Sequence, residues 1–130
     1  MQKLLIIITC IVMCFIAWIL YMADTNQATV FFDWVRRTPH GDKIGHIVLF
    51  GFLAFCLNLA STFRTINRGC FSIYQGSLVV LLFVTLEELS QAFIPQRTLD
   101  GMDYLASVMG IVLFSILTFF VKKITFKTLS

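Results

Sequence analysis

Four long apolar runs alternate with short polar segments along this chain. They cover residues 4–22, 44–63, 71–93 and 104–121. A helix of about 20 apolar residues crosses the hydrocarbon core of a bilayer and pairs its own backbone polar groups there. The alternating pattern typical of membrane β-barrel strands does not occur in the sequence. The runs therefore predict an all-α fold, a single integral membrane domain over residues 1–130 built as a four-helix transmembrane bundle.

The composition agrees with a membrane protein and disfavours other classes. Of 130 residues, 58% are hydrophobic and 13% charged, and the mean hydropathy is +0.88. An average soluble domain is about half apolar and about a quarter charged, and a chain this short has too little polar surface to cover so much apolar side chain. A soluble globular domain, a disordered chain and a nucleic-acid binder are disfavoured, so no nucleic-acid partner is expected. The net charge of +3 suits membrane lipid, some of it anionic, as the partner.

The first run is predicted to be an uncleaved anchor helix in a multi-pass protein of the bacterial inner or plasma membrane. Its apolar core is longer than that of a usual signal peptide, and Tyr21-Met22-Ala23 is a poor cleavage site. Lysine and arginine favour the cytoplasmic side of short loops. An N-in, C-in orientation is expected because it places six basic residues inside and four outside. The six are Lys3, Arg64, Arg68, Lys122, Lys123 and Lys127.

The longest connection, residues 23–42, contains Val30-Phe31-Phe32-Asp33-Trp34-Val35-Arg36-Arg37. Aromatic rings followed by paired arginines are typical of a segment that lies in the membrane interface, with the arginines near lipid phosphates. We therefore expect an interfacial aromatic loop after the first helix. An ordinary aromatic-belt loop without a binding role fits the same composition.

Most of the remaining charged side chains lie near the ends of the last three predicted helices. The second helix begins around residues 42–46, the third ends around residues 87–91, and the fourth begins around residues 100–107. Because consecutive spans alternate in direction, these three ends share one leaflet, which is the outer one in the N-in orientation. The sequence predicts a ligand-binding pocket there, with the residues Asp42, Lys43, His46, Glu88, Gln91, Arg97, Asp100, Asp103 and Ser107.

Two adjacent glutamates, Glu87 and Glu88, fall inside the membrane or at its outer margin. A glutamate facing lipid costs a few kcal/mol or more, so both are expected to turn inward, be protonated or pair with Lys43, Arg97 or His46. Neighbouring side chains point about 100° apart on a helix, so both can hardly serve one pocket.

Simpler roles are open for the same residues. Asp42 and Asp103 are candidate helix caps, Asp42 in particular as the N-cap of the second helix. A lone histidine among carboxylates is a poor set of zinc ligands, so no metal site and no cofactor are predicted. Among metal ions, a hard cation such as Ca²⁺ would suit the carboxylate oxygens better than a transition metal. An internal salt-bridge cluster that ties three helices together remains an alternative.

At these residues the chain resembles the VanZ-like family of small membrane proteins. The resemblance covers residues 40–115 and rests on Asp42-Lys43-x-x-His46, Glu88-x-x-Gln91, Phe93-x-Pro95-x-Arg97 and Asp100-x-x-Asp103, with small residues as far as Gly110. It favours Glu88 over Glu87, since Glu88 stands at the family's Glu-x-x-Gln position. Many members carry Asn where this chain has Ser107, which offers one donor and one acceptor in place of an amide. The resemblance implies a largely uncharacterised activity and a link to low-level resistance to the glycopeptide teicoplanin.

The leading functional hypothesis is a binding protein for a polar or anionic group of an envelope lipid or a lipid-linked cell-wall precursor. Lys43 and Arg97 would supply charge for phosphate or carboxylate. Glu88, Gln91 and Asp103 would orient hydroxyl, amine or amide groups, while His46 would make the site sensitive to pH.

Two other classes stay open. A membrane enzyme acting on a lipid-linked substrate would use His46 as base or nucleophile, Glu88 as its orienter and Arg97 as oxyanion stabiliser, although the sequence has no nucleophile motif of the G-x-S-x-G kind. A structural or assembly protein, which includes a homo-oligomer, would use small residues for close helix contacts. Those residues are Gly45, Gly51, Ala54, Ala106 and Gly110.

Overall fold

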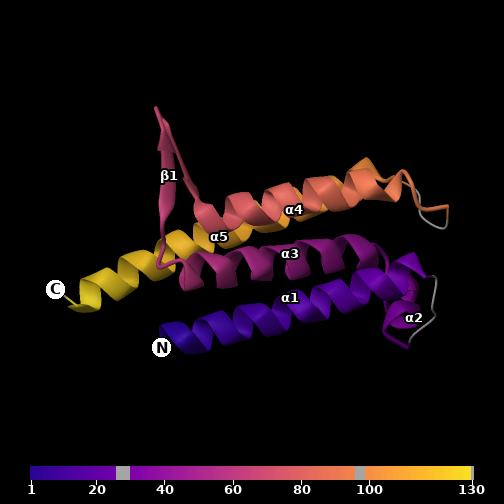
Figure 1. The fold of residues 1–130 in the computed structure, drawn as a ribbon, viewed down its shortest axis with the longest axis horizontal. Coiled ribbons are helices and arrows are strands. Elements are labelled where there is room, and N and C mark those ends of the chain that lie inside the picture. Colours follow the sequence, from indigo (N-terminus) through magenta and orange to yellow (C-terminus); the bar gives the residue numbers. More distant parts are fainter. Residues whose placement is uncertain (26–29, 96–98, 130) are drawn as a thin grey trace.

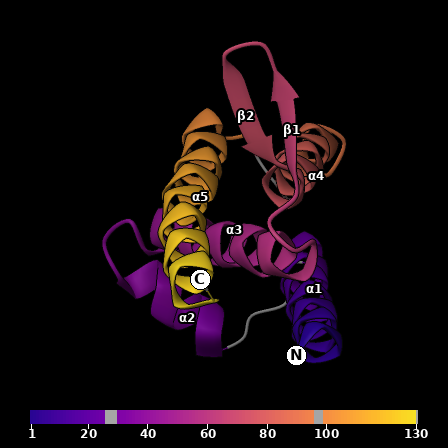
Figure 2. The same ribbon diagram turned by 90° about the vertical axis from the view of Figure 1, so that its left-hand side faces the viewer.

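The computed structural model describes residues 1–25, 30–95 and 99–129, and these are mostly helical (Figure 1). The elements in chain order are α1 (Gln2–Asp24), α2 (Val30–Arg37), α3 (Gly41–Ala60), β1 (Thr65–Arg68), β2 (Phe71–Tyr74), α4 (Gln75–Gln91) and α5 (Gly101–Leu129). The four long helices run side by side, and the hairpin formed by β1 and β2 projects across their direction at the end where the N-terminus lies (Figures 1 and 2).

Helix α3 lies at the centre and contacts α1, α2, α4 and α5 (Figure 2). Its most extensive contact is with α5. The buried apolar core consists of side chains that α3 shares with its neighbours, namely Ile16 of α1, Phe50, Leu53 and Ala54 of α3, Val80 and Val84 of α4, and Ile111 of α5. The other helices therefore pack around α3.

Small residues bring α3 and α5 close together. A Cβ added to Gly110 would collide with the backbone of Ile47, and a Cβ at Gly51 would meet the Phe114 ring and the Gly110 carbonyl. Both positions confirm the expected close approach of these two helices. Gly45 differs, because nothing lies within 4 Å of a Cβ built there.

Three helices, α1, α3 and α5, are long and apolar enough to cross a membrane, over Gln2–Ala23, Gly41–Ala60 and Gly101–Thr128. Large apolar side chains are exposed along their outer faces, whereas Asn58, Ser107 and Thr118 are fully buried. An apolar exterior around interior polar groups is the distribution that lipid favours, since water-exposed domains bury their apolar side chains instead.

The prediction of an all-α chain with a helix from residue 71 is wrong at its start. Phe71–Tyr74 pairs antiparallel with Thr65–Arg68, with Arg68 opposite Phe71 across a two-residue turn. Gly69 has φ +61° in that turn, the left-handed conformation that short hairpins require. The hydropathy pattern counted Phe71, Ile73 and Tyr74 as part of a span, but aromatic and β-branched residues are also the types that favour a strand.

The helix that follows is correspondingly short. Helix α4 has 17 residues, which at 1.5 Å per residue give about 26 Å, less than the ~30 Å hydrocarbon core. The second predicted span also ends earlier than residue 63, at Ala60, because Thr62 and Phe63 adopt left-handed backbone conformations. The fourth extends beyond its predicted bounds of 104–121 and forms the 29-residue α5.

The expected interfacial aromatic loop is a helix over most of its length. Val30–Arg37 forms α2, with Arg36 and Arg37 in its last turn. Val30 and Trp34 are exposed, while Val35 is half-buried on the side that packs against α3. Helix α2 therefore covers one side of the bundle end at which α3 begins (Figure 1).

Candidate functional site

The predicted polar residues come from three helix ends that lie at the same end of the bundle, away from the hairpin (Figure 1). Asp42, Lys43 and His46 occupy the first turns of α3, and Asp103 and Ser107 the first turns of α5. Glu87, Glu88 and Gln91 occupy the last turns of α4. The expected convergence of the three ends is seen in the contacts of Lys43 with Asp103, of His46 with Ser107 and of Glu88 with Asp100. Asp100 directly precedes α5. Arg97, the ninth predicted residue, lies outside the described residues.

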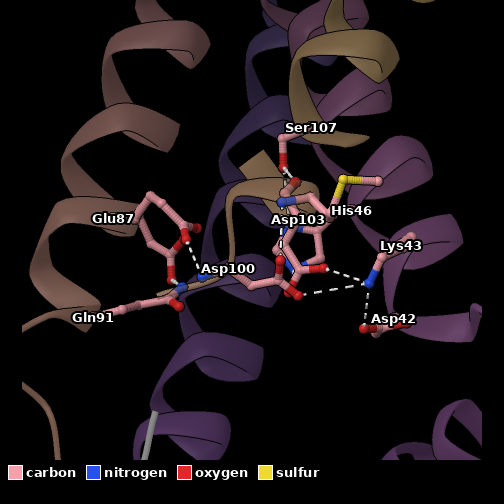
Figure 3. Close-up of polar contacts among 10 residues, drawn as sticks. Asp42, Lys43, His46, Glu87, Gln91, Asp100, Asp103 and Ser107 are labelled. Carbon is pink, nitrogen blue, oxygen red and sulfur yellow. Dashed lines mark hydrogen bonds and ion pairs between the residues drawn. The ribbon is translucent and has the colours of Figure 1, made fainter. Parts of the chain in front are cut away.

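Lys43 is surrounded by three carboxylates. Its Nζ lies 3.3 Å from Asp42 Oδ2, 3.3 Å from Asp103 Oδ1 and 3.7 Å from Asp100 Oδ2 (Figure 3). Carboxylates thus outnumber the ammonium, and one cation joins the start of α3 to the start of α5. These four residues, together with His46 and Ser107, are called the charged cluster below.

His46 has a polar partner on each ring nitrogen. Its Nδ1 lies 3.0 Å from Ser107 Oγ, and its Nε2 lies 3.9 Å from Asp103 Oδ2. Ser107 Oγ also lies 3.0 Å from the Asp103 carbonyl. A hydroxyl has a single hydrogen, so the tautomer of neutral His46 sets its direction. With the proton on Nδ1, Ser107 accepts from His46 and donates to the Asp103 carbonyl; with the proton on Nε2, Ser107 donates to Nδ1 and Nε2–H faces the Asp103 carboxylate.

Glu88 is 7% exposed, and its Oε1 accepts a hydrogen bond from the Asp100 backbone N–H at 2.9 Å. The Asp100 carboxylate in turn accepts from Met102 N–H, which is the bond of a helix N-cap, and reaches Lys43 with its other oxygen. Glu88 thus connects to the charged cluster through Asp100. The expected separation of the two glutamates is seen as well, because Glu87 Oε1 accepts from Gln91 Nε2 at 2.7 Å (Figure 3).

The expected capping roles need correction. The residue before α3 is His40, which has φ +56° and makes no side-chain capping bond, while Asp42 lies inside the first turn. There its charge still favours the positive end of the helix dipole. At α5 the cap is Asp100 and not Asp103. This shift frees Asp103 to pair with Lys43 and to face His46.

A cavity of about 220 Å³ opens beside the charged cluster, between α1, α2 and α3. Its apolar wall includes Ile16, Ile19 and Leu20 of α1. Its polar wall comprises Arg36 of α2 with Asp42, His46 and Asp103. Of the eight predicted residues that the structure describes, Asp42, His46 and Asp103 line it, whereas Lys43, Glu88, Gln91, Asp100 and Ser107 do not.

Arg36 is the residue that sequence reasoning did not assign to the site. The signal was present, since paired arginines follow an aromatic segment directly before the second long helix. That signal was interpreted as contact with lipid phosphates alone, because the composition does not reveal which arginine turns toward α3. In the structure Arg36 lines the cavity and Arg37 does not.

A second polar group of side chains is buried at the hairpin end of the same three helices. Asn58 Nδ2 donates to Ser77 Oγ at 2.9 Å and to Thr118 Oγ1 at 3.3 Å, while Asn58 Oδ1 accepts from Ser77 N–H at 2.9 Å. Ser77 Oγ also lies 2.7 Å from Ser115 Oγ. We call Asn58, Ser77, Ser115 and Thr118 the neutral cluster. Sequence reasoning missed it, although Asn58 interrupts an apolar run.

Within residues 1–25, 30–95 and 99–129, no group of three or more His, Cys, Asp or Glu side chains is arranged to hold a metal ion. Comparison with known proteins gives no further information on the site: no family model matches the chain. No curated protein matches it, and neither does any solved structure.

Proposed function

We propose that this chain is a VanZ-like integral membrane protein that binds a polar or anionic group of an envelope lipid or lipid-linked cell-wall precursor. The observation that carries the proposal is the cavity between α1, α2 and α3, which has an apolar wall on one side and Arg36, Asp42, His46 and Asp103 on the other. A ligand with an apolar chain and a charged head matches both walls.

The size of the cavity favours part of a lipid as the ligand. Pockets for drug-sized molecules usually measure about 300–1,000 Å³, and this cavity measures about 220 Å³. It has room for a head group, with the apolar remainder of the molecule lying along α1 in the membrane. Phosphate or carboxylate would pair with the guanidinium of Arg36, which binds such groups with two parallel hydrogen bonds.

The charged cluster would recognise the uncharged or cationic part of the same ligand. Lys43 is already paired with three carboxylates, so its contribution is to hold Asp103 in place. Asp103 then offers an acceptor to hydroxyl, amine or amide hydrogens at the cavity wall, and so does Nε2 of His46 in its Nδ1–H tautomer, which the proposal takes. Compared with the sequence hypothesis, Arg36 takes the role of anion binder that was given to Lys43 and Arg97.

Charge distribution supports an outer-leaflet position for this cavity. The hairpin end of the molecule has Lys3, Arg64, Arg68, Lys122, Lys123 and Lys127 and none of the seven acidic residues. Basic residues favour the cytoplasmic side, so the hairpin end would lie inside and the cavity outside. Both termini would then be cytoplasmic, and α4 would be the fourth helix of a transmembrane bundle. Cys70 at the hairpin turn tests this orientation, since a membrane-impermeant maleimide should label it only after the cells are permeabilised.

The family assignment rests on the motif residues quoted above. What supports it is that Lys43 and His46 lie in contact with Asp100, Asp103 and Ser107, which stand in a separate part of the motif. A contribution to glycopeptide resistance is part of the proposal and would follow from binding a cell-wall precursor at the outer surface. Arg36 lies outside the region of resemblance.

The proposal is tested by thermal unfolding of the detergent-purified protein with phosphatidylglycerol, phosphatidylethanolamine or a polyprenyl phosphate added. We expect at least one of these lipids to raise Tm, as a ligand of the folded state does, and Arg36→Ala to remove the rise. Arg37→Ala is the matched control, since Arg37 is an adjacent exposed arginine that does not line the cavity. No shift with any lipid, or the same loss in both variants, would contradict the proposal.

One observation favours an enzyme as the second candidate. His46 lines the cavity, and its ring lies between Ser107 and Asp103. In a hydrolase for a polyprenyl pyrophosphate, Nε2 of the Nδ1–H tautomer would take a proton from the water that attacks the terminal phosphorus. The bond from that phosphorus to the bridging oxygen would break, which releases inorganic phosphate and leaves the polyprenyl phosphate. Ser107 is unsuited as nucleophile because it is fully buried and hydrogen-bonded within α5. Release of phosphate from a polyprenyl pyrophosphate, lost in His46→Ala, would favour this candidate, and no release would exclude this reaction.

A further inference from the structure

A second, larger hollow lies at the other end of the molecule. It is a groove of about 1130 Å³ between the hairpin, α4 and the C-terminal half of α5. It shares no lining residue with the cavity described above. The groove therefore raises a separate question, which does not depend on the proposed function.

The floor of the groove is apolar and elongated. Val108, Ile111, Val112, Ile116 and Phe119 of α5 line it, and the lining continues to Lys122 and Lys123. From residue 108 to residue 122 the helix rises about 21 Å. One leaflet contributes roughly half of the ~30 Å hydrocarbon core. The groove is thus long enough for an acyl chain along the depth of one leaflet and for the head group above it.

The rim at the hairpin end is polar and basic. Asn67 and Ser72 on the two strands and Lys122 and Lys123 on α5 line this part of the groove. None of the chain's acidic residues lines it. Two ammonium groups beside hydroxyl and amide groups are complementary to a phosphate that bears a glycerol or sugar alcohol.

We propose that this groove binds one anionic phospholipid of the leaflet that faces the hairpin. One acyl chain lies against α5 between α4 and the hairpin, and the phosphate lies between Lys122 and Lys123. A zwitterionic lipid would match the apolar floor equally well, but it offers the two lysines no net charge. The site therefore selects by head-group charge.

Native mass spectrometry of the full-length protein in detergent tests the selectivity, with phosphatidylglycerol and phosphatidylcholine of identical acyl chains added in equal amounts. We expect one phosphatidylglycerol to be retained with a preference of about tenfold, since each basic residue near an anionic lipid strengthens binding appreciably. The double variant Lys122→Gln/Lys123→Gln should abolish the preference. Arg64→Gln/Arg68→Gln removes the same charge from exposed hairpin positions outside the groove and should leave it unchanged. Equal retention of both lipids by the wild type, or equal behaviour of the two double variants, would overturn the proposal.

A matched pair of tryptophan substitutions tests whether the lipid lies in the groove. Ile116 lines the groove and is 50% exposed, whereas its neighbour Leu117 is 45% exposed and does not line it. Both positions tolerate a larger side chain because they are open. Ile116→Trp should expel the phosphatidylglycerol, and Leu117→Trp should keep it. Retention of the phosphatidylglycerol by both variants, or its loss from both, would overturn the proposal. A protein dimer that Ile116→Trp dissociates would also overturn it, because a second copy of the chain would then be the occupant of the groove.

Discussion

Helices α3, α4 and α5 carry two internal polar clusters, one toward each end, and the two differ in charge and in how their polar groups are paired. In the neutral cluster, Asn58 and Thr118 are fully buried, and Asn58 uses both its amide nitrogen and its oxygen in hydrogen bonds. In the charged cluster, three carboxylates share one ammonium, and Asp42 and Asp103 line a cavity. In the neutral cluster the Asn58 amide is fully buried and paired, and Ser77 and Ser115 also line the groove at the hairpin end; in the charged cluster carboxylates in excess of the ammonium face the cavity.

This difference separates a role in folding from a role in binding. A buried polar group without a partner is costly in lipid, so a paired network stabilises the arrangement of helices that satisfies it. A cluster with excess carboxylates beside a cavity has spare hydrogen-bond acceptors for another molecule. The comparison predicts that substitutions in the neutral cluster lower stability, whereas those in the charged cluster lower binding.

The largest expected effect on stability is that of Asn58→Ala. The substitution removes three hydrogen bonds among α3, α4 and α5 and leaves the Ser77 N–H without its acceptor. Interhelical hydrogen bonds in membranes contribute about 0.6 kcal/mol each on average, so we expect a loss of about 2 kcal/mol in the free energy of unfolding. In a domain of this size that lowers Tm by roughly 5–10 °C, measured by thermal unfolding in detergent.

Thr125→Ala is the control for this prediction. Thr125 is an exposed residue of α5 outside the groove, and its hydroxyl donates to the Val121 carbonyl of the same helix, so its substitution should leave Tm nearly unchanged. If Asn58→Ala unfolds at the wild-type temperature, the neutral cluster does not hold the three helices together. The prediction that substitutions in this cluster lower stability is then wrong.

Asp103→Asn is the corresponding substitution in the charged cluster. Asparagine has the same shape, and Lys43 keeps Asp42 and Asp100 as partners. We expect Tm to stay within a few degrees of the wild type, while the rise of Tm on lipid addition is lost, as is usual for residues that serve binding at the expense of stability. A drop in Tm as large as that of Asn58→Ala would instead identify the charged cluster as a structural clamp.

The sequence was sufficient for the features that depend on hydropathy and chain direction. Apolar length identified α1, α3 and α5 as membrane-crossing candidates, and alternating direction brought residues 42–46 close to residues 100–107. It was insufficient at Phe71–Tyr74, because a hydropathy window adds apolar residues without regard to which of them also favour a strand.

Side-chain partners were harder to predict than their neighbourhood. Which carboxylate pairs with Lys43 depends on the rotation of α5 about its axis, and that rotation follows from the close contact of Gly110 with the backbone of Ile47. Arg36 could not be chosen over Arg37 without knowing how α2 docks on α3. Asn58 is different, because a single amide within an apolar run already indicates a buried hydrogen-bonded position.

The smallest change tests the tautomer of His46 that the binding proposal takes. In the Nδ1–H tautomer, Ser107→Ala removes the acceptor of Nδ1–H, so the proton of neutral His46 should move to Nε2, where the Asp103 carboxylate lies 3.9 Å away. The loss of one hydrogen bond should cost about 1 kcal/mol in stability. The ¹⁵N chemical shifts of the imidazole report the tautomer, with His40→Gln to assign the other histidine and Ser90→Ala as an exposed serine control.

If the wild-type protein already carries the His46 proton on Nε2, Ser107 must donate to Nδ1 and not to the Asp103 carbonyl. His46 would then present a donor where the binding proposal needs an acceptor. An Nδ1–H tautomer in the wild type that changes in Ser107→Ala, with Tm nearly unchanged, would show that Ser107 positions the histidine and contributes little to holding the helices together. Ser107 would then share the binding role of the charged cluster, although it is as fully buried as Asn58 and Thr118 of the neutral cluster.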